Sequence, residues 1–381
     1  MSRRPLKIAI ASAGRFHVLD LARELHALGH EVRFHSYVPR RRAERFGLPG
    51  ECQRPVTARL APLLAWQRLA PRLAPENRDR WINSTLDRAV AARLTPCDVF
   101  IFMSGIFLDA ARAAKRRYGA RLWLERGSAH IAVQDEILAR IPGAARPSAG
   151  TLARELAGYA LTDRIVVPSA FAARTFVGHE ASKLFLNPYG VDLEQFPMVE
   201  RPRREGPLRL LFVGNWSTQK ACDLLAPAIR AVPGGATITH VGPITDAPFP
   251  SDDARFRHFG QVDQPQLAAY YAEADALVLP SRQDGFGLVI AQALATGLPV
   301  ICSDHTGGPD LARTSALAAR IVVAPAGDAP ALTAAIIETG RRLSAGLPPL
   351  TADDRESLSW RAYGARYAAE IARDVFGDAA T

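Results

Sequence analysis

Residues suited to chemistry gather in one short stretch of the chain, from Asp284 to Gln292. Gly285 and Gly287 let the backbone approach a ligand with no side chain in the way. A segment of helix length begins at Leu288, and the free N–H groups of its first turn offer a site for an anion. Asp284 and Gln292 are eight residues apart, so we expect them to hold two different parts of one elongated ligand.

Two basic side chains and a histidine extend this set. Lys220 follows an apolar run and a short loop, so its ammonium group can reach a ligand that lies across the end of a strand; a solvated loop lysine is the alternative. Arg126 and His130 follow another apolar run. Because imidazole titrates near neutrality, His130 could orient or deprotonate a substrate hydroxyl. A structural histidine with partners inside the fold is the alternative.

These residues need strands that end at the same edge of a sheet. Apolar runs of strand length alternate with helical patterns along the whole chain. We expect strands at residues 6–11, 32–37, 97–103, 121–124 and 165–167, and then at residues 208–213, 237–241, 276–279, 299–302 and 320–323. This alternation predicts an α/β architecture, in which helices cover both faces of parallel sheets.

Length and a linker divide the chain into two domains. With 381 residues and 48% hydrophobic content, the chain exceeds what one core usually supports. Residues 194–207 contain three prolines and a cluster of charges, a composition typical of linkers. We therefore expect domains at residues 1–195 and 205–356, with a ligand cleft between them at the carboxyl ends of the strands. An amphipathic helix within residues 357–381 closes the chain.

The formal charge of +9 is concentrated in one region. Only four of the 47 basic residues are lysines, which indicates a codon bias toward arginine. Residues 40–93 contain twelve arginines against five acidic residues. A solvated helical face with a buried apolar side is one interpretation, and contact with an anionic membrane surface is another. Nucleic-acid binding is a poor third, because the chain has no recognition motif. The apolar residues within this region include Leu63, Leu64, Trp66, Leu69 and Trp81.

The cysteines and the apolar runs indicate the cellular compartment of the protein. The four cysteines are scattered, with no CxxC pair and no Cys/His cluster of metal-site spacing, which favours a reducing cytoplasmic compartment. The start of the chain superficially resembles a signal peptide, but its apolar core of about eight residues is followed at once by Arg15, which favours a strand. No apolar run reaches the length of about 18 residues that a membrane span needs. Any membrane contact would therefore be peripheral, at the inner face.

Five motifs follow one another along the chain. They are GHEV at Gly29, VPSAFAARTF at Val167, NPYGVDLEQF at Asn187, FVGNWSTQKACDLL at Phe212, and residues 274–311. Together they resemble family 4 of the retaining glycosyltransferases, enzymes of the GT-B fold. The resemblance covers most of the chain and is strongest beyond residue 160. Each motif alone is weak, whereas their order and spacing are specific.

This resemblance implies two Rossmann-like domains that face a central cleft, with the terminal helix crossing back to the first domain. It implies transfer of a sugar from a nucleotide-diphosphate donor, held by the second domain, to a sugar or lipid-linked acceptor, held by the first. The donor would be a UDP-, GDP- or ADP-linked sugar. The anomeric configuration would be retained, and neither a cofactor nor a bound metal would be required. The product would belong to a polysaccharide, lipopolysaccharide or other glycoconjugate.

The resemblance also assigns roles to residues near the donor phosphates. Lys220 would stabilise the charge on the departing diphosphate. The family usually places an arginine five residues before this lysine, where this chain has Asn215. Another arginine would then have to substitute, and Arg126 is a candidate. Gly14 is the one glycine in the first loop, where the family often has two near the diphosphate.

Asp284 and Gln292 take the positions of two glutamates that the family spaces as E-x7-E. At the second position the carboxylate accepts hydrogen bonds from ribose hydroxyls, and a glutamine keeps one such acceptor without the charge. At the first position Asp284 keeps a carboxylate that suits a sugar hydroxyl. The loop that we expect to frame the donor consists of Gly285, Phe286, Gly287 and Leu288, with Phe286 as a packing residue.

Two other functions remain open. A nucleotide-sugar epimerase would share the two-domain architecture, although the motifs agree better with the transferases. A non-catalytic sugar-nucleotide-binding protein is the second alternative, because Asn215 and Gln292 depart from the family pattern. A glycoside hydrolase is disfavoured, because it needs two carboxyl groups beside the bond and Gln292 cannot be one of them.

Overall fold

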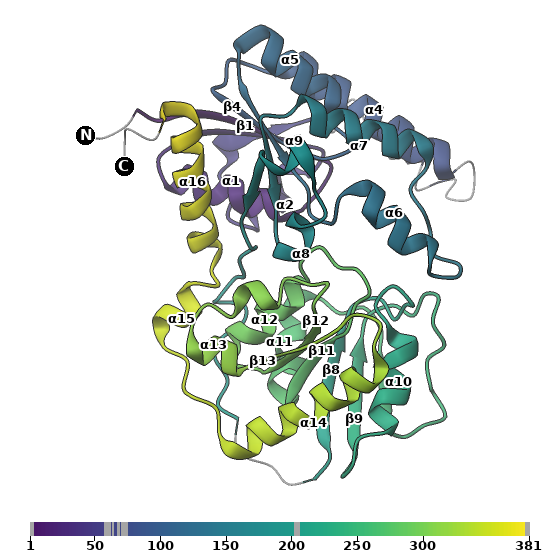
Figure 1. Ribbon diagram of the computed structural model, residues 1–381. Coiled ribbons are helices and arrows are strands. Elements are labelled where there is room, and N and C mark those ends of the chain that lie inside the picture. Colours follow the sequence, from purple (N-terminus) through teal and green to yellow (C-terminus); the bar gives the residue numbers. More distant parts are fainter. Residues whose placement is uncertain are drawn as a thin grey trace.

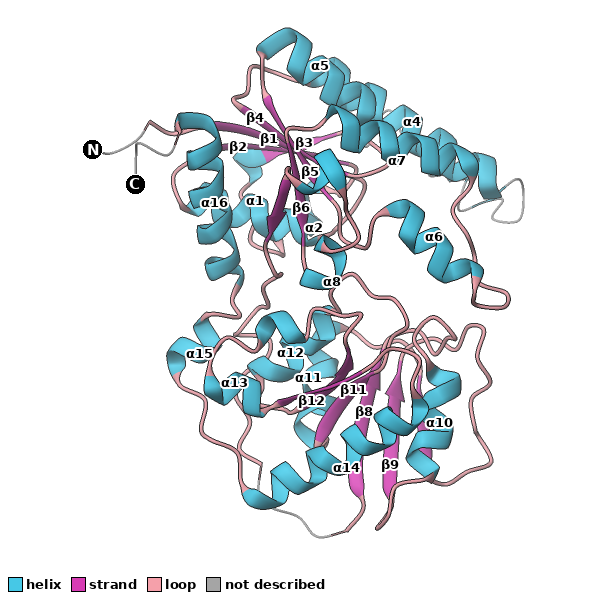
Figure 2. Cartoon of the chain, viewed as in Figure 1, coloured by secondary structure: helices cyan, strands magenta, loops and turns pink. Residues whose placement is uncertain are grey.

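The computed structural model describes residues 4–56, 62, 65, 66, 69, 75–201 and 206–377, which contain two parallel sheets (Figure 1). The first sheet has seven strands in the order β3-β2-β1-β4-β5-β6-β7, and the second has six in the order β10-β9-β8-β11-β12-β13. Helices lie on both faces of the sheets (Figure 2). The predicted α/β fold with two Rossmann-like domains is confirmed.

The elements of the first domain alternate as expected. Its strands are β1 (Lys7–Ser12), β2 (Glu31–Ser36), β3 (Gln53–Pro55), β4 (Val99–Met103), β5 (Arg121–Glu125), β6 (Arg164–Val167) and β7 (Leu184–Leu186). Its helices include α1 (His17–Ala27), α2 (Arg40–Glu44), α4 (Pro75–Arg93), α5 (Leu108–Tyr118), α6 (Ile131–Ala139), α7 (Ala149–Leu161), α8 (Ala170–Ala173) and α9 (Gly178–Ala181).

The second domain repeats this pattern. Its strands are β8 (Leu208–Val213), β9 (Ala236–Val241), β10 (Phe256–Phe259), β11 (Ala276–Leu279), β12 (Val300–Ser303) and β13 (Ile321–Ala324). Its helices include α10 (Cys222–Arg230), α11 (Gln264–Glu273), α12 (Leu288–Ala295), α13 (Ser315–Ala319), α14 (Ala329–Ala345) and α15 (Ala352–Glu356). The last helix of the chain is α16 (Trp360–Phe376).

The three strands that were not predicted, β3, β7 and β10, all lie at sheet edges. An edge strand pairs on one side only and is often short or polar, so its apolar signal is weak. The sequence of β10 is FRHF, with its two central residues exposed. The central strands, by contrast, are buried on both faces and form the apolar runs that were recognised.

The chain crosses between the domains twice, and the two crossings lie side by side. Val191 in the first crossing forms a parallel bridge with Ser359 in the second. Gly190 has no room for a side chain, because a Cβ atom there would lie 2.5 Å from the backbone of Trp360. The two crossings therefore form one packed hinge rather than two separate linkers.

After the second crossing, α16 returns to the first domain and packs against α1 (Figure 1). Gly364 allows this close approach, because a Cβ atom there would lie 2.4 Å from Glu24. Near the far end of α16, Asp374 lies 2.6 Å from the guanidinium of Arg121 and accepts a hydrogen bond from Trp123 Nε1 (3.0 Å). The predicted crossing of the terminal helix is confirmed.

Helix α12 is buried from Ile290 onward, so the carbonyl groups at its end need partners inside the protein. Gly297, in the left-handed conformation, closes the last turn with backbone hydrogen bonds. Arginines from three other segments supply the remaining donors. Arg355 donates to the carbonyl of Ala295 (3.0 Å), Arg201 to that of Thr296 (2.5 Å) and Arg320 to that of Gly297 (3.3 Å).

Part of the basic region lies outside the described residues, including Leu63 and Leu64. The described part places the rings of Trp66 and Trp81 5.6 Å apart and leaves Trp81 and Leu69 exposed. None of the helices formed by the described residues is long and apolar enough to cross a membrane.

Replacing Arg355 tests the anchoring of α12. Arg355→Met keeps the apolar stem but removes donors from the carbonyls of Ala295, Leu193 and Phe196. We expect the free energy of unfolding to fall by about 1–3 kcal/mol, because buried carbonyls lose charged donors. Urea denaturation measures the change. Arg341→Met is the control, since among the described residues Arg341 pairs only with Glu338, on an exposed helix face. Equal stability of the two variants would contradict the anchoring role.

Candidate functional site

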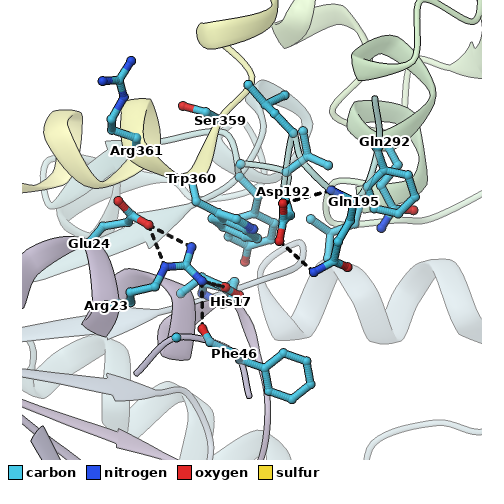
Figure 3. Close-up of a pocket in the computed structure, with 18 of the residues that line it drawn as sticks. His17, Arg23, Glu24, Phe46, Asp192, Gln195, Gln292, Ser359, Trp360 and Arg361 are labelled. Carbon is cyan, nitrogen blue, oxygen red and sulfur yellow. Dashed lines mark hydrogen bonds and ion pairs between the residues drawn. The ribbon is translucent and has the colours of Figure 1, made fainter. Parts of the chain in front are cut away.

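A cavity of about 1060 Å³ lies between the domains, beside the hinge. The loop after β1 and the start of α1 form one wall, with Arg15 and His17. The first turns of α12 form the opposite wall, with Leu288 and Gln292. The hinge around Asp192 and the start of α16 close one end (Figure 3). Segments from both domains thus meet around this space.

Gln292 is buried, and its amide oxygen is already engaged. The hydroxyl group of Tyr271 donates to Gln292 Oε1 (2.9 Å). In the structure one lone pair of this oxygen is used within the second domain, and its predicted hydrogen bond with a ribose stays a prediction. The amide nitrogen has no partner among the described residues, so Gln292 adds hydrogen-bond donors at the cavity. A ribose hydroxyl can still bind there, as an acceptor.

Lys220 and Asp284, which are 64 residues apart in the chain, lie together. Lys220 Nζ is 2.5 Å from Asp284 Oδ2, and the other carboxylate oxygen accepts the Phe286 N–H (3.3 Å). Lys220 immediately precedes Ala221, the one non-glycine residue with positive φ among the described residues. This pair does not line the cavity beside the hinge. The predicted donor residues therefore form two groups, one around Lys220 and one around Gln292.

Side-chain contacts fix the loop that carries Lys220 against the loop that carries Asp284. Gln219 Nε2 donates to Gln283 Oε1 (2.7 Å), and Arg282 binds both Asp223 and the carbonyl of Thr218 (2.6 Å each). Asn215 lies at the start of the first loop, with an exposed side chain. The loops around the ion pair are thus rigidly joined, while Asn215 stays available at their edge.

The glycine loop contacts the first domain directly. A Cβ atom on Gly285 would lie 1.7 Å from the carbonyl oxygen of Gly127. Phe286 is buried, with its ring 5.2 Å from that of Tyr189. Gly287 has φ +79° and lets the chain turn into α12. We expected these glycines to bring the backbone close to a ligand. In this structure Gly285 brings it close to the backbone of the first domain.

A second contact joins the domains at α8. The backbone N–H of Ala170 donates to both carboxylate oxygens of Asp310 (3.0 and 3.1 Å), and Ser169 Oγ donates to the carbonyl of Gly285 (2.6 Å). The ring of Phe171 stacks on His305 with centroids 4.5 Å apart. Figure 1 shows α8 between the two sheets. The carboxyl ends of both sheets are therefore held together by polar contacts.

Arg126 is buried and occupied within the first domain. Its guanidinium donates to the carbonyl of Ala129 (2.9 Å), to Glu155 (3.2 Å) and to Gln134 (2.5 Å). Each of Nε, Nη1 and Nη2 thus has one protein contact, and the role of Arg126 as a phosphate cation stays a prediction.

His130 likewise has partners for both ring nitrogens. Nδ1 accepts the Ala132 N–H (3.2 Å) as the cap of α6, and Nε2 lies 3.1 Å from Glu180. Burial lowers the pKa of His130, although Glu180 acts in the opposite direction. In this conformation the geometry matches the structural alternative for His130.

Gly14 lies in the loop after β1, where its carbonyl accepts a hydrogen bond from Ser12 Oγ (2.8 Å).

A different histidine faces the cavity. His17, the first residue of α1, is buried, and its Nε2 lies 2.9 Å from Glu125 Oε2. The other oxygen of Glu125 accepts the hydroxyl group of Tyr367 from α16 (2.7 Å). The imidazole ring of His17 stacks on the ring of Tyr189, with centroids 4.2 Å apart. His17 was not among the predicted residues, although its place just after the first strand could have indicated it.

Arg15 extends from the same loop toward the second domain. Its Nη1 lies 3.2 Å from Gln264 Oε1, at the start of α11. Its guanidinium also lies 3.5 Å from the ring centroid of Phe46, a distance typical of a cation–π contact. Arg15 therefore places a cation on the first-domain wall of the cavity, and this wall faces Gln292.

Two parallel-sheet Rossmann-like domains joined in this way define the GT-B fold, and solved structures agree. Sucrose-phosphate synthase from Thermosynechococcus elongatus aligns with a TM-score of 0.69 at 21% identity, over 100% of both chains. The Anabaena protein HepE in complex with UDP-glucose aligns with a TM-score of 0.63 at 14% identity, over 96% of this chain and 99% of that one.

Sequence comparison points to the same superfamily. Residues 207–340 match the family described as glycosyl transferases group 1. Over 128 residues the chain is 36% identical to glycogen synthase from Mycobacterium tuberculosis. This match spans 31% of the chain and 31% of that protein's length. These similarities, centred on the second domain, support a place in the GT-B glycosyltransferase superfamily; membership of family 4 stays a prediction.

Replacing Gly285 tests the contact between the domains. Gly285 does not have positive φ, so alanine suits its backbone, but the added Cβ would meet Gly127. We expect Gly285→Ala to hold the domains apart and to increase the radius of gyration in small-angle X-ray scattering. Gly260→Ala is the control, because no atom of the described part of the chain comes within 4 Å of its Cβ position. An unchanged scattering curve for Gly285→Ala would show that the contact is not maintained in solution.

Proposed function

We propose that the protein is a retaining glycosyltransferase that uses a nucleotide-diphosphate sugar and acts in polysaccharide, lipopolysaccharide or other glycoconjugate biosynthesis. The observation that carries the proposal is the Lys220–Asp284 pair at the head of α12, within the segment that matches the glycosyl transferases group 1 family. HepE, a protein of the same fold, was solved with UDP-glucose. By analogy, the donor of this chain lies along α12, with its ribose at Gln292.

In this proposal the charge of the diphosphate is stabilised from three directions. Lys220 and the first turn of α12 face the phosphates from the second domain, where helix N–H groups favour anions. Arg15 supplies a cation from the first domain and takes the place that Asn215 leaves unfilled. Asp284 orients Lys220 and accepts a hydrogen bond from a hydroxyl of the transferred sugar. Fixed charges of this kind lower the barrier where charge develops.

The reaction then needs no nucleophile from the protein. The bond between the anomeric carbon and the phosphate oxygen breaks, and the nucleotide diphosphate leaves with the electron pair. The acceptor oxygen bonds to the same face of the sugar, and its proton passes to a phosphate oxygen of the leaving group. Because a donor that reaches both Gln292 and Lys220 must pass the contact of Gly285 with Gly127, we infer that the domains separate there when the donor enters.

Turnover of nucleotide sugars tests the function. We expect the protein to release nucleotide diphosphate from at least one of UDP-, GDP- and ADP-linked sugars with carbohydrate acceptors, and NMR to show a retained anomer. Lys220→Met should lower kcat by about 100-fold or more, because a fixed cation is lost. Lys115→Met, on the exposed face of α5 beside Asp163, is the matched control and should leave turnover unchanged.

Other outcomes of this assay would favour the alternatives. Donor recovered with inverted configuration and without any acceptor would indicate an epimerase. Tight nucleotide binding without turnover would indicate a non-catalytic binding protein. Neither binding nor release across the panel would contradict the proposal.

We also propose that the first domain touches an anionic membrane surface through the basic region. Trp81 and Leu69 are exposed there beside arginines such as Arg80, and amphipathic basic surfaces bind such membranes. Trp81→Ser should weaken flotation with vesicles that contain phosphatidylglycerol, whereas Phe376→Ser, at the end of α16, should not. Equal flotation of the wild type with neutral and anionic vesicles would contradict this contact.

A further inference from the structure

The contacts of His17 determine which of its ring nitrogens carries a proton. Glu125 is fully buried, and its carboxylate accepts hydrogen bonds on both sides, from Tyr367 (2.7 Å) and from His17 Nε2 (2.9 Å). Burial raises the pKa of Tyr367 well above its usual value, so its hydroxyl group stays a donor. An ionised carboxylate can only accept. Nε2 is therefore the nitrogen that donates to Glu125, and Nδ1 is the nitrogen left for a ligand.

Two polar atoms at this wall of the cavity have no protein partner. Among the described residues, none donates to His17 Nδ1. Tyr189, stacked on the imidazole ring, has a buried hydroxyl group that also lacks a partner within the described part of the chain. His17 is 9% exposed and Tyr189 7% exposed. Buried polar groups are nearly always hydrogen-bonded, so the unpartnered hydroxyl group of Tyr189 points to a ligand at this wall. His17 Nδ1, on the ring stacked against Tyr189, is the adjacent acceptor.

The opposite wall indicates the chemistry of that ligand. Gln292 presents N–H donors there, because its oxygen accepts a hydrogen bond from Tyr271. Arg15 adds a cation from the wall of His17 itself. A ligand that fits both walls carries acceptor oxygens toward Gln292, an anionic group near Arg15 and a hydrogen-bond donor toward His17. A sugar hydroxyl is such a donor. His130 cannot offer the same lone pair in this conformation, because its Nδ1 caps α6 and its Nε2 faces Glu180.

We propose that His17 binds a sugar hydroxyl through Nδ1 and determines specificity for the sugar, with Glu125 and Tyr367 as its positioning residues. This inference rests on the proposed function. The hydroxyl can belong to the transferred sugar or to the acceptor, and the two sources share this chemistry.

The tautomer is measured first, by ¹⁵N NMR of histidine-labelled protein. We expect the Nε2–H form at His17 in the wild type. In Glu125→Gln the amide can donate to Nε2, so part of the population should shift to the Nδ1–H form. A wild-type protein in the Nδ1–H form would overturn the proposal, because no lone pair would then face the cavity. This measurement does not depend on activity.

Binding is measured next, with UDP, GDP and ADP and with UDP-glucose, GDP-mannose and ADP-glucose. If His17 holds the transferred sugar, His17→Leu should bind the nucleotides as the wild type does but the matching nucleotide sugar about tenfold more weakly, the range expected for one lost hydrogen bond in a polar site. If it holds the acceptor, donor binding should stay unchanged and the KM for the acceptor should rise about tenfold.

Three variants separate a direct contact from a structural one. His17→Asn keeps an acceptor near the position of Nδ1 and should recover part of the lost affinity. Tyr367→Phe removes one partner of Glu125 and should have a smaller effect of the same kind. His26→Leu, on the same helix and paired with Glu51 outside the cavity, is the control and should bind like the wild type.

Failure of this inference is distinguishable from failure of the proposed function. If folded His17→Leu matches the wild type in both nucleotide-sugar affinity and acceptor KM, the inference is wrong and the transferase proposal stands. If the wild type binds no nucleotide or nucleotide sugar, the proposed function is wrong, and the inference that depends on it is overturned as well.

Discussion

The structure depends on hydrogen-bond partners for the carbonyl groups at the buried carboxyl end of α12. This helix starts at the cleft and ends in the core of the second domain, where unpaired carbonyl groups would be strongly unfavourable. Positive charge at the carboxyl end also complements the helix dipole. Arg201, Arg320 and Arg355 supply both hydrogen bonds and charge. The amino end is thereby left free to face an anion.

These arginines also connect α12 to the hinge. Arg201 comes from the first crossing between the domains, and Arg355 from α15, just before the second crossing. Arg355 further donates to carbonyls of Leu193 and Phe196 in the first crossing. A change in the angle between the domains must therefore be accommodated around the end of α12. The orientation of the proposed donor-binding helix and the orientation of the domains are physically linked.

The sequence predicted the central strands, the two Rossmann-like domains and the start of α12, because each leaves a local signal. Apolar runs, turn glycines and a helix start are properties of neighbouring residues. The contacts of Arg126 and His130 could not be predicted in this way. Their partners, such as Glu155 for Arg126 and Glu180 for His130, lie on other elements. The position of His17 just after the first strand is a local signal, but its contact with Glu125, and through it with Tyr367, is distant in sequence.

Gln292 shows how one substitution changes the meaning of a motif. A glutamate at this position would direct negative charge toward the cavity, whereas Gln292 is neutral, accepts from Tyr271 and adds N–H donors for a ligand. The opposite wall carries His17, whose Nδ1 can accept a hydrogen bond, and the cation of Arg15. A ligand that carries hydroxyl groups, acceptor oxygens and an anionic group satisfies both walls, and a nucleotide-diphosphate sugar has all three.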